Sequence, residues 1–147
     1  MKIKVAWVGK TKEPAVQTLT DEYLKRISRY ADIEGISLRD EADLLKWGER
    51  SGMRPAHTLV LLDSRGKQLS SEEFAKFLDD QANRNPQPLL FAVGPADGFG
   101  EKIRAAAAFT LSLGKMTLAH ELARIVLLEQ LYRGFAILKG HPYHLGH

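Results

Sequence analysis

The chain has 147 residues, no cysteine and a formal net charge of +3 at pH 7. This length suits a single domain, over residues 1–147, with a sizeable apolar core, and the lack of cysteine excludes a disulfide scaffold, a thiol nucleophile and a cysteine-ligated metal. The opening residues are too short and too charged for a signal peptide, and no apolar run approaches the ~20 residues that cross a bilayer, so we expect a cytoplasmic protein with no membrane partner, whose mildly basic charge permits RNA binding.

Short apolar runs alternate with segments of helical periodicity. The first strand is predicted over Ile3–Val8, and Pro14 suits the first turn of a helix whose apolar residues recur from Val16 to Tyr30. In chain order there follow a strand over Ile33–Leu38, a helix over Glu41–Arg50, a strand over Thr58–Leu62, a turn over Ser64–Lys67, a helix capped by Ser70 or Ser71, a strand over Leu89–Val93, a loop over Gly94–Gly100, a helix over Glu101–Ala108, a strand over Phe109–Leu113 and a long helix over Glu121–Leu138.

This alternation predicts an α/β fold. The strands are apolar along their whole length, which is typical of a parallel sheet covered by helices on both faces. Neither a change of composition nor a linker nor an internal repeat divides the chain, so we expect one domain.

Two of the predicted loops follow strands and contain small residues. Gly94–Gly100 lacks the spacing of a dinucleotide or triphosphate loop, which leaves either a tight connection or a backbone that a ligand approaches closely. In the second loop, Leu113, Met116 and Leu118 can form apolar walls for an adenine ring, and the backbone of residues 114–117 can meet its polar edge. The alternative for this second loop is an ordinary connection between a strand and a helix.

The last helix and its flanks carry most of the candidate polar groups. Arg124 interrupts the apolar stretch Leu122–Leu128, so its guanidinium needs either a partner or a ligand. Glu129 and Arg133 are spaced as an i, i+4 pair, which often only supports a helix. His120, just before this helix, is either a functional group or a surface residue near the helix start.

The histidines of the tail have a weak metal-binding signal. His141, His144 and His147 lie three residues apart, but Pro142 and the preceding glycine remove any helical register, so we expect no metal site. We expect Tyr143 to stack on a base and the histidines to contact phosphate or to move a proton.

Five segments spread over the chain together resemble one known family. They are KIKVAWVGK (2–10), VLLDSRGK (60–67), LLFAVGPADGF (89–99), SLGKMTLAHELARIVLLEQLYRGFAI (112–137) and GHPYH (140–144). The combination is similar to the ribosomal RNA large subunit methyltransferase H family, small SPOUT enzymes that methylate N3 of a pseudouridine in 23S rRNA. The resemblance covers essentially the whole chain.

The resemblance implies a fold with a C-terminal trefoil knot and S-adenosylmethionine (S-adenosyl-L-methionine) as the cofactor. It places the cofactor pocket at Leu62, Gly94, Leu113, Gly114, Lys115, Met116, Thr117 and Leu118. The chain departs from the family pattern at Pro95, where a second glycine is usual, at Ala119, where proline is usual, and after the Pro-Tyr-His of the tail.

Methylation of a uracil-like N3 first requires loss of its proton, which a nearby cation or base must favour. We therefore expect Arg124 and Arg133 to stabilise the imide anion or to hold phosphate. His144 is the leading candidate for the base and His120 the second, with Tyr143 beside them at the mouth of the active site.

The last helix is more apolar than one buried face requires. The apolar surface of this helix is wide enough to be buried on two sides, which predicts a homodimer. The alternative is a central helix inside a monomer. By resemblance, the tail of one copy lies beside the pocket of the other, and the partner is 23S rRNA in the large subunit or the 70S ribosome. Two alternatives stay open, namely a SPOUT methyltransferase that acts on tRNA and a non-catalytic module that binds the cofactor and the ribosome.

Overall fold

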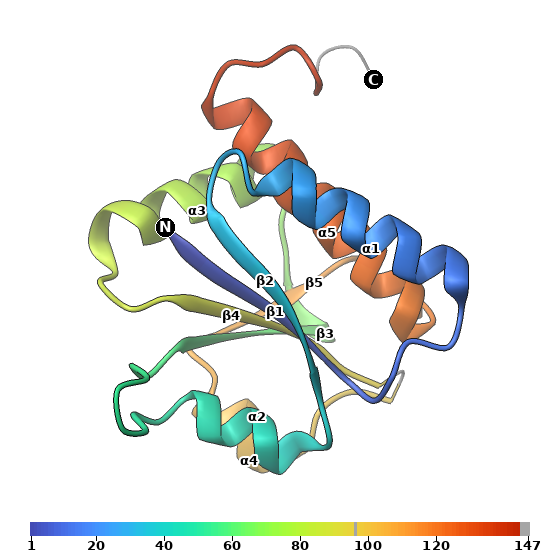
Figure 1. Cartoon of the computed structure of the whole chain (residues 1–147), viewed down its shortest axis with the longest axis vertical. Helices are drawn as coiled ribbons and strands as arrows, with labels where there is room; N and C mark the ends of the chain where they lie inside the picture. The colour runs from blue at the N-terminus through green and yellow to red at the C-terminus, as the bar shows by residue number, and fades with distance from the viewer. Residues whose placement is uncertain (96, 145–147) are drawn as a thin grey trace.

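The computed structural model describes residues 1–95 and 97–144. In this part of the chain, five strands form one sheet in the order β2-β1-β4-β3-β5, and every neighbouring pair is parallel (Figure 1). The strands are β1 (Lys2–Val8), β2 (Asp32–Leu38), β3 (Thr58–Gln68), β4 (Leu89–Val93) and β5 (Phe109–Ser112). The helices are α1 (Pro14–Ile27), α2 (Glu41–Trp47), α3 (Ser71–Arg84), α4 (Glu101–Ala106) and α5 (His120–Leu138).

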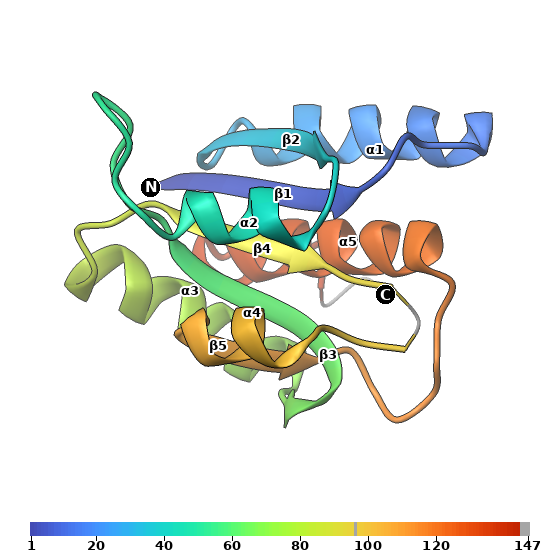
Figure 2. The same cartoon turned by 90° about the horizontal axis from the view of Figure 1, so that it is seen from below.

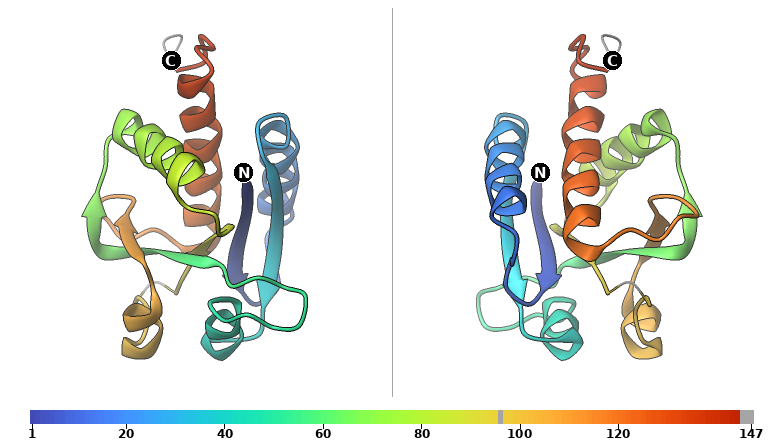
Figure 3. Two further views of the ribbon diagram at one scale, coloured as in Figure 1. Left: turned by 90° about the vertical axis from the view of Figure 1, so that its left-hand side faces the viewer. Right: turned by 90° about the vertical axis from the view of Figure 1, so that its right-hand side faces the viewer.

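Helices cover both faces of the sheet, as the apolar strands predicted. Helices α1, α3 and α5 lie on one face, and α2 and α4 lie on the other (Figure 1; Figure 3). Side chains alternate along β4, so that Leu89, Phe91 and Val93 pack in the first layer while Leu90 and Ala92 pack in the second. The sheet is therefore buried on both sides, which confirms the predicted α/β architecture.

The predicted turn over Ser64–Lys67 is wrong. Strand β3 continues through these residues to Gln68, and its pairing with β5 shifts register, so that Leu62 and Lys67 are both paired with Leu111. The charged residues and the glycine that suggested a turn instead form an irregular stretch inside a longer strand. The other predicted elements are present, with ends that differ by a few residues; α5, for example, begins at His120.

Helix α5 is the longest helix and lies between α1 and α3 (Figure 3). Its inner residues Leu127, Leu128 and Leu131 are fully buried, whereas Leu122 near its start is half exposed. At 1.5 Å per residue, its 19 residues span about 28 Å, from the carboxyl edge of the sheet to the tail. In the described ranges, no helix has both the length and the apolarity to cross a membrane.

The long β3 strand generates a test of the fold at Gly66. A Cβ atom added there would lie 2.7 Å from backbone atoms of Thr110 and Leu111, closer than such atoms approach in proteins. The Gly66→Ala variant must therefore displace β5, and we expect it to lose about 1–3 kcal/mol of unfolding free energy in urea titrations. The matched control Lys67→Ala changes an exposed side chain and should stay within about 0.5 kcal/mol. Equal midpoints for the two variants would contradict the observed pairing of β3 with β5.

Candidate active site

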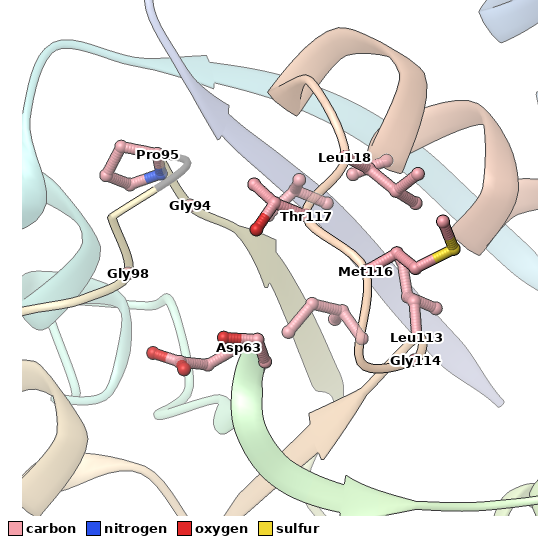
Figure 4. Close-up of a pocket in the computed structure, with 13 residues that line it drawn as sticks. Asp63, Gly94, Pro95, Gly98, Leu113, Gly114, Met116, Thr117 and Leu118 are labelled. Atoms are coloured by element: carbon pink, nitrogen blue, oxygen red, sulfur yellow. The ribbon is translucent and has the colours of Figure 1, made fainter.

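A pocket opens at the carboxyl edge of the sheet, beside the ends of β4 and β5 and the middle of the long β3 strand (Figure 4). These strands are neighbours and run parallel, so the loops that follow β4 and β5 meet beside residues 62–64 of β3. The pocket and its open mouth together enclose about 490 Å³ of space. Its lining residues are Leu62, Asp63, Ser64, Val93, Gly94, Pro95, Gly98, Leu113, Gly114, Met116, Thr117, Leu118 and Ala123.

The structure brings together seven of the eight residues that the resemblance implied for the cofactor. They come from strand β3 and from the loops that follow β4 and β5, and only Lys115 of the eight does not line the pocket. Its side chain is exposed, as is that of Met116, which is 85% exposed at the rim. Gly114 adopts a φ of +140°, and an added Cβ there would meet no atom within 4 Å, so the space beside its backbone is open.

Asp63 belongs to this site although the sequence reasoning did not select it. Its buried carboxylate accepts hydrogen bonds from Arg65 Nε at 3.0 Å and Arg65 Nη2 at 2.7 Å, and from the Phe99 amide at 3.3 Å. Arg65 Nη2 also donates to the Phe99 carbonyl at 3.1 Å. The Arg65 guanidinium holds the pKa of the Asp63 carboxyl well below its usual range, despite the opposing effect of burial. A charged residue directly after the apolar run 58–62 was the available signal.

This ion pair fixes the loop that follows β4. The ring of Phe99 lies against Gly94, where a Cβ atom would approach it to 2.6 Å. Gly98, with a φ of +88°, donates its amide to the Pro95 carbonyl at 2.9 Å and so closes a turn. Pro95 itself has no amide hydrogen, so the hydrogen bonds that a ligand could receive here must come from other backbone groups.

Arg124 is fully buried beneath the site and does not line the pocket. Its guanidinium stacks 3.7 Å from the centre of the Trp7 ring, and Nη1 donates to Thr11 Oγ1 at 2.8 Å and Thr20 Oγ1 at 3.4 Å. Within the described chain, Nε and Nη2 have no hydrogen-bond partner. Burial lowers the pKa of this guanidinium, which the nearby Glu121 carboxylate opposes.

His120 lies on the other side of the Gly94–Pro95 segment. As the first residue of α5, it lines a second pocket together with residues that follow β1 and β2. Across the residues that the structure describes, no hydrogen bond reaches its ring, which is half-buried. The sequence placed His120 just outside the helix, and the structure places it at a pocket next to that of the cofactor candidates.

The three remaining candidates, Arg133, Tyr143 and His144, form one cluster at the far end of α5. Glu129 accepts from Arg133 Nη2 at 2.8 Å and from the Tyr143 hydroxyl at 2.7 Å. His144 contacts Arg133 Nη1 through Nδ1 at 2.9 Å, and Glu72 Oε1 through Nε2 at 2.8 Å. Burial, together with the bond to Glu129, raises the pKa of Tyr143.

This tail cluster does not meet the pocket within one chain. Arg133 lies thirteen residues after His120 on the same helix, which corresponds to about 20 Å. Figure 3 shows the tail and the loop that precedes α5 at opposite ends of this helix. The residues proposed for catalysis therefore fall into two groups.

No set of three metal-ligating side chains comes together in the described ranges. His141 bonds to the Tyr30 hydroxyl and His144 to Arg133 and Glu72, while His147 lies outside the described residues. The observed partners of these histidines are thus protein groups.

Comparisons with known proteins place this geometry in a family. The family model described as "Predicted SPOUT methyltransferase" matches residues 1–144. The ribosomal RNA large subunit methyltransferase H of Koribacter versatilis is 58% identical over 147 residues, covering all of both chains, and that of Geotalea daltonii is 48% identical, covering 98% of this chain and 99% of the other.

A solved structure supports the fold. It is a probable methylase family protein from Haemophilus influenzae, with a TM-score of 0.55 and 10% identity, covering 97% of this chain and 69% of the other. The identities over the full chain and the match to the family model agree with the convergence of three chain segments on one pocket. The chain belongs to the SPOUT methyltransferases and, within them, to the ribosomal RNA large subunit methyltransferase H family.

Proposed function

We propose that this protein uses S-adenosylmethionine to methylate N3 of a pseudouridine in 23S rRNA, within the large subunit or the 70S ribosome. The observation that carries the proposal is the convergence of Leu62, Gly94 and the Leu113–Leu118 loop on one pocket in a member of this family. A ribosomal substrate would place the reaction in the cytoplasm.

The residues of the first pocket fit an adenosine-containing cofactor. Leu62, Leu113 and Leu118 offer apolar walls, and the glycine at position 114 lets a ligand approach the backbone. When bound, the cofactor would supply a methyl group activated by a sulfonium charge. We also propose, from the resemblance, that the loops around this pocket belong to a C-terminal trefoil knot.

Removal of the N3 proton falls to side chains of the protein. Both ring nitrogens of His144 are already engaged, by Arg133 and Glu72, whereas no hydrogen bond reaches the ring of His120 in the described chain. We therefore assign the base to His120, which reverses the order expected from the sequence. The proton passes from N3 to the imidazole, and N3 keeps the electron pair that accepts the methyl group.

The tail cluster acts from a second copy of the chain in this proposal. Within one chain it lies about 20 Å from His120, too far to contact a substrate there. Leu122, 51% exposed, and Met116, 85% exposed, leave apolar surface uncovered beside the pocket, which a homodimer would bury. Arg133, Tyr143 and His144 of the second copy would then hold the RNA at the pocket mouth.

Transfer of a labelled methyl group tests the proposed function directly. Purified protein, labelled S-adenosylmethionine and ribosomes should yield label in 23S rRNA, at N3 of a pseudouridine by mass spectrometry of nucleosides. Total tRNA in a parallel reaction should stay unlabelled. Label in tRNA alone would favour the alternative substrate, and no label in either reaction would favour a non-catalytic module.

The Gly114→Val substitution tests the cofactor pocket. A branched side chain would fill the open space beside the backbone, at a φ of +140° that favours glycine, so we expect the affinity for S-adenosylmethionine to fall by about 100-fold or more. Isothermal calorimetry measures this, with thermal unfolding as a check of folding. The matched control Lys115→Ala alters the adjacent exposed residue and should keep its affinity. Equal affinity in both variants would exclude this pocket as the cofactor site.

Mixed dimers test the shared site. Light scattering should give twice the chain mass of 16.4 kDa, and His144→Ala should lower turnover without changing the affinity for the cofactor. A heterodimer of one Gly114→Val chain and one His144→Ala chain retains one intact pocket facing one intact tail. We expect it to recover about half of the wild-type turnover, although each homodimer is inactive or weak. Heterodimers that form but stay at the level of the separate variants would reject the model.

A further inference from the structure

The second pocket lies at the same carboxyl edge as the first, where β1, β2 and β4 end. It encloses about 990 Å³ together with its wide mouth, and its walls are mainly apolar. Val8, Val93 and Ala42 contribute to these walls, while Glu41 and His120 bring polar groups to it. A nucleoside has the matching character, because its ring has apolar faces and a polar edge.

One wall is common to the two pockets. Both pockets are lined by Val93, Gly94 and Pro95. A ligand in the second pocket would therefore lie across this one segment from a cofactor in the first. A methyl acceptor must lie directly beside the methyl donor. The second pocket therefore has the position that the acceptor requires.

The mouth of the second pocket carries charges of both signs, since Arg39, Asp40 and Glu41 all line it. Arg39 lies there with a side chain 81% exposed, held by Asp43 at 3.0 Å. Lys10 and Lys12 are exposed on the loop that follows β1, which ends in this pocket at Val8. These three exposed cations are the groups of this region that a phosphate backbone could contact.

The Glu41 carboxylate can accept a further hydrogen bond. Its Oε1 accepts the Gly100 amide at 3.0 Å, which ties this carboxylate to the loop that separates the two pockets. In the part of the chain that the structure describes, no hydrogen bond reaches its Oε2, and the residue is half-buried. A partly buried carboxylate oxygen is stabilised when a ligand donates a hydrogen bond to it.

We propose that the second pocket holds the target nucleoside, and that Glu41 selects pseudouridine over uridine by accepting the hydrogen bond of its N1–H. This inference rests on the proposed function and names the group that reads the substrate. Uridine has no such donor, because its N1 is bonded to the sugar and its C5 carries only a C–H.

The ring geometry of pseudouridine matches this arrangement. Its N1–H and N3–H flank a single carbonyl group, so a ring that presents N3 to the Gly94–Pro95 wall presents N1 to the neighbouring side. Glu41 is held at that side by its bond to Gly100. The ring of His120, to which no hydrogen bond leads in the described part of the chain, lines the same space and completes the set of groups around the imide edge.

The test compares methylation of two ribosome preparations that both lack the methyl group. One has pseudouridine at the target position. The other has uridine there and comes from cells without the enzyme that converts this uridine to pseudouridine. We expect the wild-type protein to prefer pseudouridine in kcat/KM. Glu41→Gln should lower kcat/KM for the pseudouridine ribosomes by about 10- to 100-fold, as expected for one lost hydrogen bond to a charged acceptor, and leave the uridine ribosomes nearly unchanged. The amide still offers an oxygen to Gly100, and Glu101→Gln, an exposed carboxylate of α4, is the matched control for loss of charge.

The outcomes separate the inference from the proposed function. A wild-type protein that methylates neither preparation would overturn both. If the wild-type protein methylates the two preparations at equal rates, the role of Glu41 is overturned and the proposed function is kept. The same holds if Glu41→Gln lowers both rates together, so that the preference for pseudouridine is unchanged.

A second variant tests the pocket without touching Glu41. Ala42→Phe places a large ring in the apolar wall at an exposed position of α2. We expect it to reduce methylation of both preparations at least tenfold, with unchanged affinity for S-adenosylmethionine by calorimetry. Unchanged turnover in this variant would overturn the assignment of the pocket to the nucleoside.

Discussion

The parallel direction of all five strands is the constraint on which the rest of the molecule depends. The five strands share one direction across the sheet (Figure 2). Val8, Val93 and Leu62 therefore occupy neighbouring positions on β1, β4 and β3, and together with nearby loop residues they line two adjoining pockets. The ion pair of buried Asp63 with exposed Arg65 then holds the loop that both pockets share, through its bonds to Phe99. The position of this segment decides how closely a donor and an acceptor can approach.

Helix α5 imposes the second constraint, because its length keeps two groups of polar residues apart. His120 stands at the pockets, whereas Arg133, Tyr143 and His144 form a closed network of hydrogen bonds at the far end. A rigid helix cannot bend these ends together, so a site that uses both must be built from two chains. Hydrogen bonds to Glu72 and Glu129 hold the tail in place within a single chain.

The parts of the structure that the sequence predicted are those in which local pattern and tertiary packing agree. The strands are apolar throughout because both faces of the sheet are covered, and this could be inferred from the sequence. The segment Ser64–Lys67 has the composition of a turn, but its structure is set by pairing with Thr110 and Leu111, which no local pattern encodes. Asp63 was missed for the same reason, since its partner Phe99 lies 36 residues further along the chain.

Arg124 combines a structural and an electrostatic effect. Burying a guanidinium is costly, and Thr11, Thr20, the face of Trp7 and the nearby Glu121 carboxylate compensate for this charge. Since Trp7, Thr11 and Thr20 lie on β1, on the loop that follows it and on α1, the charge locks the start of α5 against the edge where the pockets open. Arg124 lies one helical turn after His120, so its fixed positive charge favours negative charge that develops on a substrate beside that histidine. In the reaction proposed above, Arg124 would therefore assist formation of the imide anion through its electric field, without contacting the substrate.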